Sequence, residues 1–65
     1  MDGDWYCVVN ISDLAIVYQG QSLQEAAERY LPGTAHGRST SKGGAVTKAR
    51  SKADKIRKAM RRAVA

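Results

Sequence analysis

The residues best suited to chemistry are eight lysines and arginines close to the C-terminal end of the sequence. A single acid, Asp54, lies among them. A Lys or Arg that contacts a phosphate of nucleic acid releases a bound counterion, so such a cluster binds strongly at low salt and weakly at high salt. We therefore predict phosphate contacts from Lys48, Arg50, Lys52, Lys55, Arg57, Lys58, Arg61 and Arg62, with secondary contacts from Arg38 and Lys42.

Charge is divided unevenly along the chain. Residues 1–28 contain five acids and neither Lys nor Arg, a net charge of −5, whereas residues 29–65 contain all 11 basic residues and one acid, a net charge of +10. This asymmetry favours a polyanionic partner. We predict a small basic protein that binds DNA or RNA mainly through phosphates. The alternative is a protein-interaction or oligomerisation module whose basic helix pairs with an acidic protein surface or with its own acidic N-terminal half.

Other kinds of chemistry have little support in the sequence. Cys7 and His36 are the only cysteine and histidine, too few ligands for a structural zinc site and too few partners for an activated nucleophile. The glycine-rich stretch lacks the Gly-Lys-Ser/Thr ending of a phosphate-binding loop. We therefore expect no enzyme activity, metal or cofactor. The acidic start and short apolar runs predict a cytoplasmic protein with no membrane span.

The elements that must position the basic residues begin with a hairpin. Residues 5–9 and 14–18 are β-branched, aromatic and aliphatic, and a turn-forming stretch separates them. Alternation places Trp5, Cys7 and Val9 on one face of the first strand. The same rule predicts a shared face for Leu14, Ile16 and Tyr18 in the second strand. Both faces of the hairpin are apolar and need cover.

A short helix and a polar connection follow the hairpin. Ser22 and Glu25 have capping-box spacing, and the helical pattern extends over residues 23–30 until Pro32-Gly33 ends it. Residues 33–44 are rich in Gly, Ser and Thr. They read either as a flexible linker or as a short third strand near 34–38.

A long helix is predicted over residues 45–65, which are rich in Ala, Lys, Arg and Met. Apolar residues recur with heptad spacing at Val46, Ala49, Ala53, Ile56, Met60 and Ala63. This narrow seam is expected to pack on the N-terminal module, in one chain or in a homodimer, because a core of this size gives only about 3–5 kcal/mol. The predicted fold is one small α+β domain.

The order of elements resembles the small RNA–DNA hybrid-binding domain at the N-terminus of eukaryotic ribonucleases H. The resemblance covers about residues 5–55 and rests on Trp5-Tyr6-Cys7-Val8, Ile16-Val17-Tyr18, Ser22-Leu23-Gln24-Glu25-Ala26 and Pro32-Gly33-Thr34-Ala35. Leu23 stands where that family has a tryptophan, and His36-Gly37 where it has an aromatic–lysine pair. The resemblance therefore implies a third strand near 34–38 but does not carry over hybrid binding.

Overall fold

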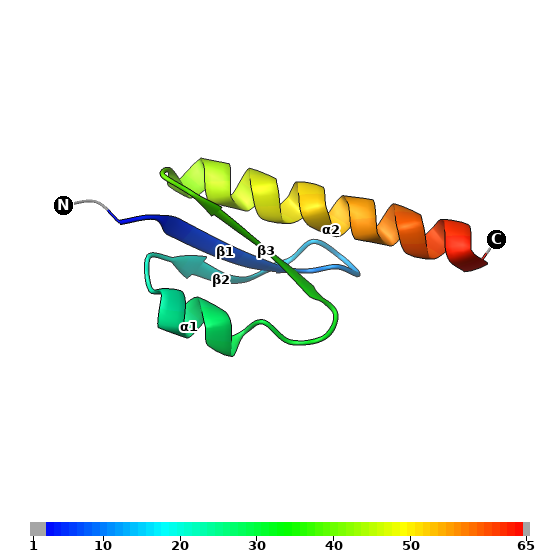
Figure 1. The fold of residues 1–65 in the computed structure, drawn as a ribbon, viewed down its shortest axis with the longest axis horizontal. Helices are drawn as coiled ribbons and strands as arrows, with labels where there is room; N and C mark the ends of the chain where they lie inside the picture. The colour runs from blue at the N-terminus through cyan, green and yellow to red at the C-terminus, as the bar shows by residue number, and fades with distance from the viewer. Residues whose placement is uncertain (1–2, 65) are drawn as a thin grey trace.

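A computed structural model describes residues 3–64 as a three-stranded antiparallel sheet between two helices (Figure 1). In chain order the elements are β1 (Trp5–Asn10), β2 (Ile16–Gly20), α1 (Leu23–Glu28), β3 (Thr34–Ser39) and α2 (Lys42–Val64). The strands lie in the order β2-β1-β3, so β1 is central. The predicted α+β class, with its hairpin, short helix and long C-terminal helix, is confirmed.

The central strand supplies apolar side chains to both faces of the sheet. Cys7 and Val9 face α2, whereas Val8 faces the side of α1, and all three are fully buried. This alternation is the one that the sequence predicts for β1. The core below α2 is small and rich in alanine; its buried members are Cys7, Val9, Ala35, Ala45, Ala49 and Ala53.

The second strand departs from the predicted alternation. Val8 pairs with Tyr18, but Val9 pairs with Ile16, so one extra residue, Val17, is accommodated between them. This is a β-bulge, and it turns Ile16 and Tyr18 to opposite faces of the sheet. The expectation that Leu14, Ile16 and Tyr18 share a face is therefore wrong. Leu14 precedes the strand and has a positive φ of 63°.

The glycine-rich stretch contains the third strand, as one of the two alternatives predicted. β3 pairs with β1 along its whole length, from Trp5 opposite Ser39 to Asn10 opposite Thr34. At Gly37, in the middle of β3, there is no room for a side chain. A Cβ added there would lie 2.5 Å from the Ala49 nitrogen and 2.6 Å from the Ala45 oxygen. The backbones of β3 and α2 therefore approach more closely than a side chain would allow.

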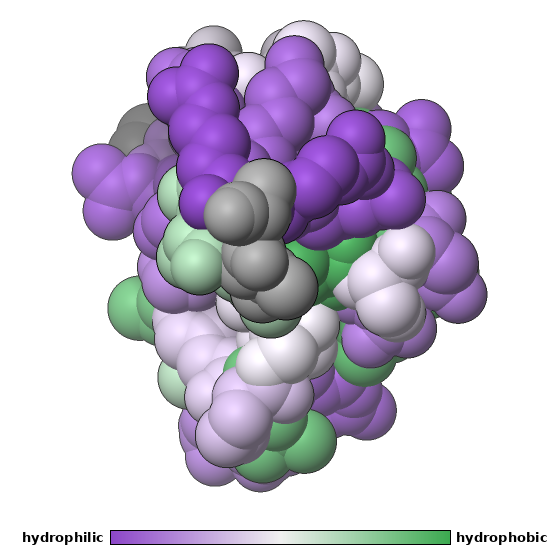
Figure 2. All heavy atoms as spheres, turned by 90° about the vertical axis from the view of Figure 1, so that its right-hand side faces the viewer, coloured by the Kyte–Doolittle hydropathy of each residue, from purple (hydrophilic) through white to green (hydrophobic). Residues whose placement is uncertain are grey.

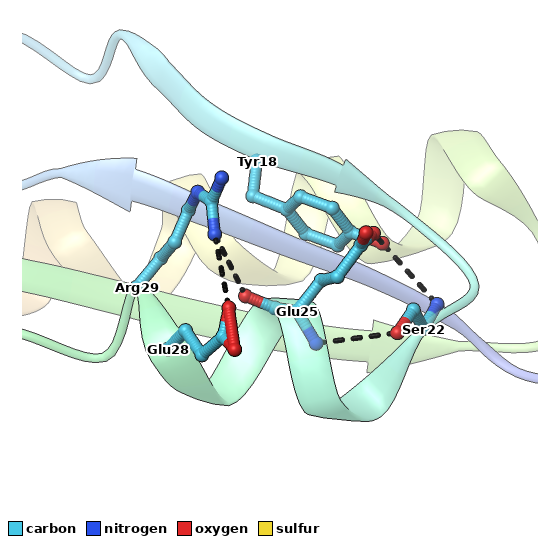
Figure 3. A network of polar contacts seen from close by, with 5 residues as sticks. All are labelled: Tyr18, Ser22, Glu25, Glu28 and Arg29. Carbon is cyan, nitrogen blue, oxygen red and sulfur yellow. Dashed lines mark hydrogen bonds and ion pairs between the residues drawn. The ribbon is translucent and has the colours of Figure 1, made fainter.

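The short helix α1 is fixed by a tyrosine-centred network (Figure 3). The Ser22 Oγ accepts a hydrogen bond from the Glu25 backbone N–H at 3.2 Å, as in a capping box. In a capping box the Glu25 carboxylate would also accept directly from the Ser22 N–H. Here the Tyr18 hydroxyl of β2 lies between them: it accepts a hydrogen bond from the Ser22 N–H and donates one to the Glu25 carboxylate, both at 3.2 Å. Of α1's own residues only Ala26 is buried, so this network anchors a helix with little core.

The long helix α2 begins at Lys42, ahead of the predicted start near Ala45. Ser41 caps it, because its Oγ accepts from the Gly44 N–H at 3.1 Å. The predicted seam packs as far as Ile56: Ala49 and Ala53 are fully buried and Ile56 packs against the core, whereas Met60 is 58% exposed. At 1.5 Å per residue α2 is about 34 Å long and β3 only about 20 Å. The end of α2 therefore projects past the sheet (Figure 1).

Candidate nucleic-acid interface

All eight predicted phosphate-contacting residues lie on α2. Seven are exposed, and the eighth, Arg57, is half-buried. The helix packs on β3 and β1 through its alanine side, so the sheet forces the charged residues outward. Figure 2, which faces the end of the molecule where α2 terminates, shows hydrophilic residues gathered around that helix.

Helical geometry sorts most of these cations into two rows. At 100° per residue, Arg50, Arg57 and Arg61 fall about 80–120° to one side of the buried Ala49. Lys48, Lys52 and Lys55 fall about 60–120° to the other side, and Arg62 lies slightly beyond them. We call the first set the arginine row and the second the lysine row. The two rows form the lateral flanks of α2, with the sheet behind it.

Few of these cations have an acid nearby. Within residues 3–64, the ion pairs are Lys58 with Asp54 at 3.1 Å, Arg38 with Asp4 at 3.2 Å and Arg29 with Glu28 at 3.8 Å. Neither row takes part in any of them. Glu25 and Glu28 lie on α1, which covers the opposite face of the sheet (Figure 1). The sheet therefore separates the acids of α1 from the cations of α2.

The two secondary residues lie apart from the rows. Arg38 is on the β3 face turned away from α2, where it pairs with Asp4. Lys42 is at the first turn of α2, with its ammonium 5.8 Å from the centre of the Trp5 ring. This cation–π contact gives Lys42 an intramolecular partner. The structure thus brings the eight helix residues onto one element but places Arg38 on another surface.

A shallow hollow lies beneath the projecting end of α2. It has a volume of about 730 Å³ and is lined by Asn10, Ile11, Ser12, Pro32, Gly33, Arg57, Met60 and Arg61. A backbone hydrogen bond from the Ile11 N–H to the Gly33 carbonyl, 2.9 Å long, holds the two loops of its floor together. Sequence reasoning missed this hollow because it joins two turns and a helix that lie far apart in the chain. The exposed heptad position Met60 was the one local signal.

The aromatic residues do not form a single stacking platform. Trp5 lies on the α2 face and packs against the core, whereas Tyr6 and Tyr18 lie on the α1 face. A separate stack joins Tyr30 and His36, whose ring centroids are 4.0 Å apart. Burial lowers the pKa of His36, and the positive charge of Lys52 adds to this effect. At neutral pH the imidazole is therefore neutral and contributes no charge to the interface.

The one thiol lies inside the core and not at the surface. Burial raises the pKa of Cys7, and the charge of Arg50 only partly opposes the shift. A buried thiol with a raised pKa is a poor nucleophile. Among residues 3–64, no three His, Cys, Asp or Glu side chains gather closely enough to hold a metal ion.

No protein-family model, curated protein or solved structure gives a significant match to the chain. In the described part of the chain, no helix is both long and apolar enough to cross a membrane.

Proposed function

We propose that this protein binds nucleic acid through the phosphate contacts of α2. The observation that carries the proposal is the scarcity of ion pairs on this helix. Within residues 3–64, Lys58 alone among the eight predicted phosphate-contacting residues forms an ion pair. Cations held close together on one helix repel one another, and the negative charge of a polyanion relieves this repulsion. The counterions that the polyanion releases on binding add to the affinity at low salt. The position of α1 and α2 on opposite faces of the sheet, with no contact between them, supports an external partner over neutralisation within the chain.

The experiment that tests the proposal is a titration against duplex DNA and duplex RNA at several salt concentrations. If about six cations engage phosphates of a B-form duplex, log K falls with log salt with a slope near −5. The control is a variant in which Glu25 and Glu28 on the opposite face are replaced by Gln. It raises the net charge without adding phosphate contacts, so its slope stays near that of the parent. Absence of binding at low salt contradicts the proposal.

A second candidate function, docking on an acidic protein surface, is favoured by the hollow beneath α2. Arg57 and Arg61 stand beside the exposed Met60 there, a combination that suits an acidic segment with an apolar side chain. Sedimentation at low and high salt tests the version in which the partner is a second copy. A salt-sensitive dimer that has no affinity for nucleic acid supports this function over the first.

A further inference from the structure

The two cation rows lie on opposite flanks of a single helix whose outer surface is left free. A helix that merely follows one strand of phosphates needs cations on one flank. Here the arginine row and the lysine row each present three charges, and the centres of the two rows are about 165° apart across the outer surface of the helix. Two such rows match two walls of phosphates, one on each side of the helix.

The surface between the rows is narrow and polar. Thr47, Ser51, Asp54 and Lys58 fall about 140–200° from the buried Ala49, so they point away from the sheet. Thr47 and Ser51 are small and exposed, and Lys58 and Asp54 neutralise each other through their ion pair. Within the described residues, no bulky apolar side chain stands on this outer surface. It can therefore approach the floor of a groove without a steric obstacle.

The width of α2 favours duplex DNA over duplex RNA as the partner. An α-helix with its side chains is about 10–12 Å across, and the major groove of B-form DNA is about 12 Å wide. The major groove of A-form RNA is deep and too narrow to admit side chains. The sheet packs against one side of α2 only, so the opposite side can enter a groove while the sheet stays outside (Figure 1).

From these observations we infer that α2 lies in the major groove of B-form duplex DNA, with its arginine and lysine rows on the phosphates of opposite strands. The inference rests on the proposed nucleic-acid binding and narrows its partner to duplex DNA. Thr47, Ser51 and Lys58 then face the base edges. Lys58 is already paired with Asp54, and the hydroxyls of Thr47 and Ser51 can contact any base. We therefore expect weak discrimination among DNA sequences.

The direct test is a methylation footprint of DNA at saturating protein. Dimethyl sulfate modifies N7 of guanine in the major groove and N3 of adenine in the minor groove. We expect protection of guanine N7 and unchanged reactivity of adenine N3. If guanine N7 in bound DNA reacts as fast as in free DNA, or if only adenine N3 is protected, the inference is overturned.

A charge-matched pair of variants tests the two rows. Each triple variant, R50Q/R57Q/R61Q or K48Q/K52Q/K55Q, removes three cations from one flank. In a groove each lowers the magnitude of the salt slope by about 2.7, because each lost phosphate contact contributes about 0.9. A change for only one triple shows one-sided tracking and overturns the inference. Circular dichroism checks that each variant folds. If a variant is unfolded, the footprint with the unmodified protein remains the test of the inference.

The same titrations separate this inference from the proposed function. Duplexes of DNA and RNA with identical sequence and length are compared at one salt concentration. We expect the DNA duplex to bind at least about tenfold more tightly, since the RNA groove excludes the helix. Equal binding to both duplexes overturns groove insertion but leaves phosphate binding intact. Failure to bind either one at low salt overturns both.

Discussion

Replacement of Gly37 by Ala tests whether close backbone contact holds α2 on the sheet. The new Cβ would lie 2.5 Å from the Ala49 nitrogen and 2.6 Å from the Ala45 oxygen. Both are backbone atoms of α2, so no change of rotamer can relieve the clash. The helix must shift away from β3 and loosen the buried alanines on which the core depends.

The expected loss of stability follows from two opposing contributions. Overpacking a core costs about 1–3 kcal/mol, and the upper part of that range applies because backbone atoms block the movement. Alanine's lower conformational entropy in the unfolded chain offsets about 0.5–1 kcal/mol of this cost. The net loss is about 2 kcal/mol. For a domain of this size it lowers the melting temperature by about 8–16 °C.

Thermal unfolding followed by circular dichroism measures this loss, and Gly43→Ala is the matched control. Gly43 lies in the first turn of α2, and an added Cβ there would have no atom within 4 Å apart from its chain neighbours and the nearby backbone of its own helix. The same chemical change at Gly43 therefore leaves stability unchanged or raises it by up to about 1 kcal/mol, through helix propensity. If Gly37→Ala melts at the temperature of the parent protein, the close approach of β3 and α2 does not exist as described.

Three further predictions concern single side chains. Tyr18→Phe removes the hydroxyl that joins Ser22 to Glu25 and is expected to cost about 1 kcal/mol in urea unfolding; an unchanged midpoint contradicts the role of this network. Because Cys7 is buried, its reaction with an aromatic disulfide reagent should be slow in the native protein and rapid in denaturant, whereas equal rates would place the thiol at the surface. The His36 resonance should titrate with a pKa below 6.5 and move upward in Lys52→Gln; an unmoved pKa argues against the influence of Lys52. Because the unfolded chain binds the His36 proton more readily, its contribution to stability is fully present above pH 6.5 and is lost as pH falls toward the folded-state pKa.

Much of the fold is predictable because its signals are local. The alternation of β1 and the capping serine of α1 each depend on residues a few positions apart. The angular positions of the cations on α2 follow from helical spacing alone, so the candidate interface could be named from the sequence. The same holds for the α+β class, since each element has its own periodicity.

Other features depend on partners far away in the chain. The glycine-rich stretch has little intrinsic preference for a strand, and β3 forms because β1 offers it a complete ladder of hydrogen bonds. The bulge at Val17 depends on the pairing of β1 with β2, which no local pattern records. The hollow beneath α2 likewise requires two distant turns to meet.

The sequence by itself determined the division of charge, because it places every Lys and Arg after residue 28 and concentrates eight of them within residues 45–65. The tertiary structure alone decided which way that helix faces. Gly37 lets the alanine side of α2 settle against β3, and the short sheet ends before the helix does. Packing therefore turns the two cation rows to the flanks and leaves the outer surface open. The residues themselves fix the charge, but the side of the molecule on which the charged side chains lie is set by the packing of the neighbouring alanines against the sheet.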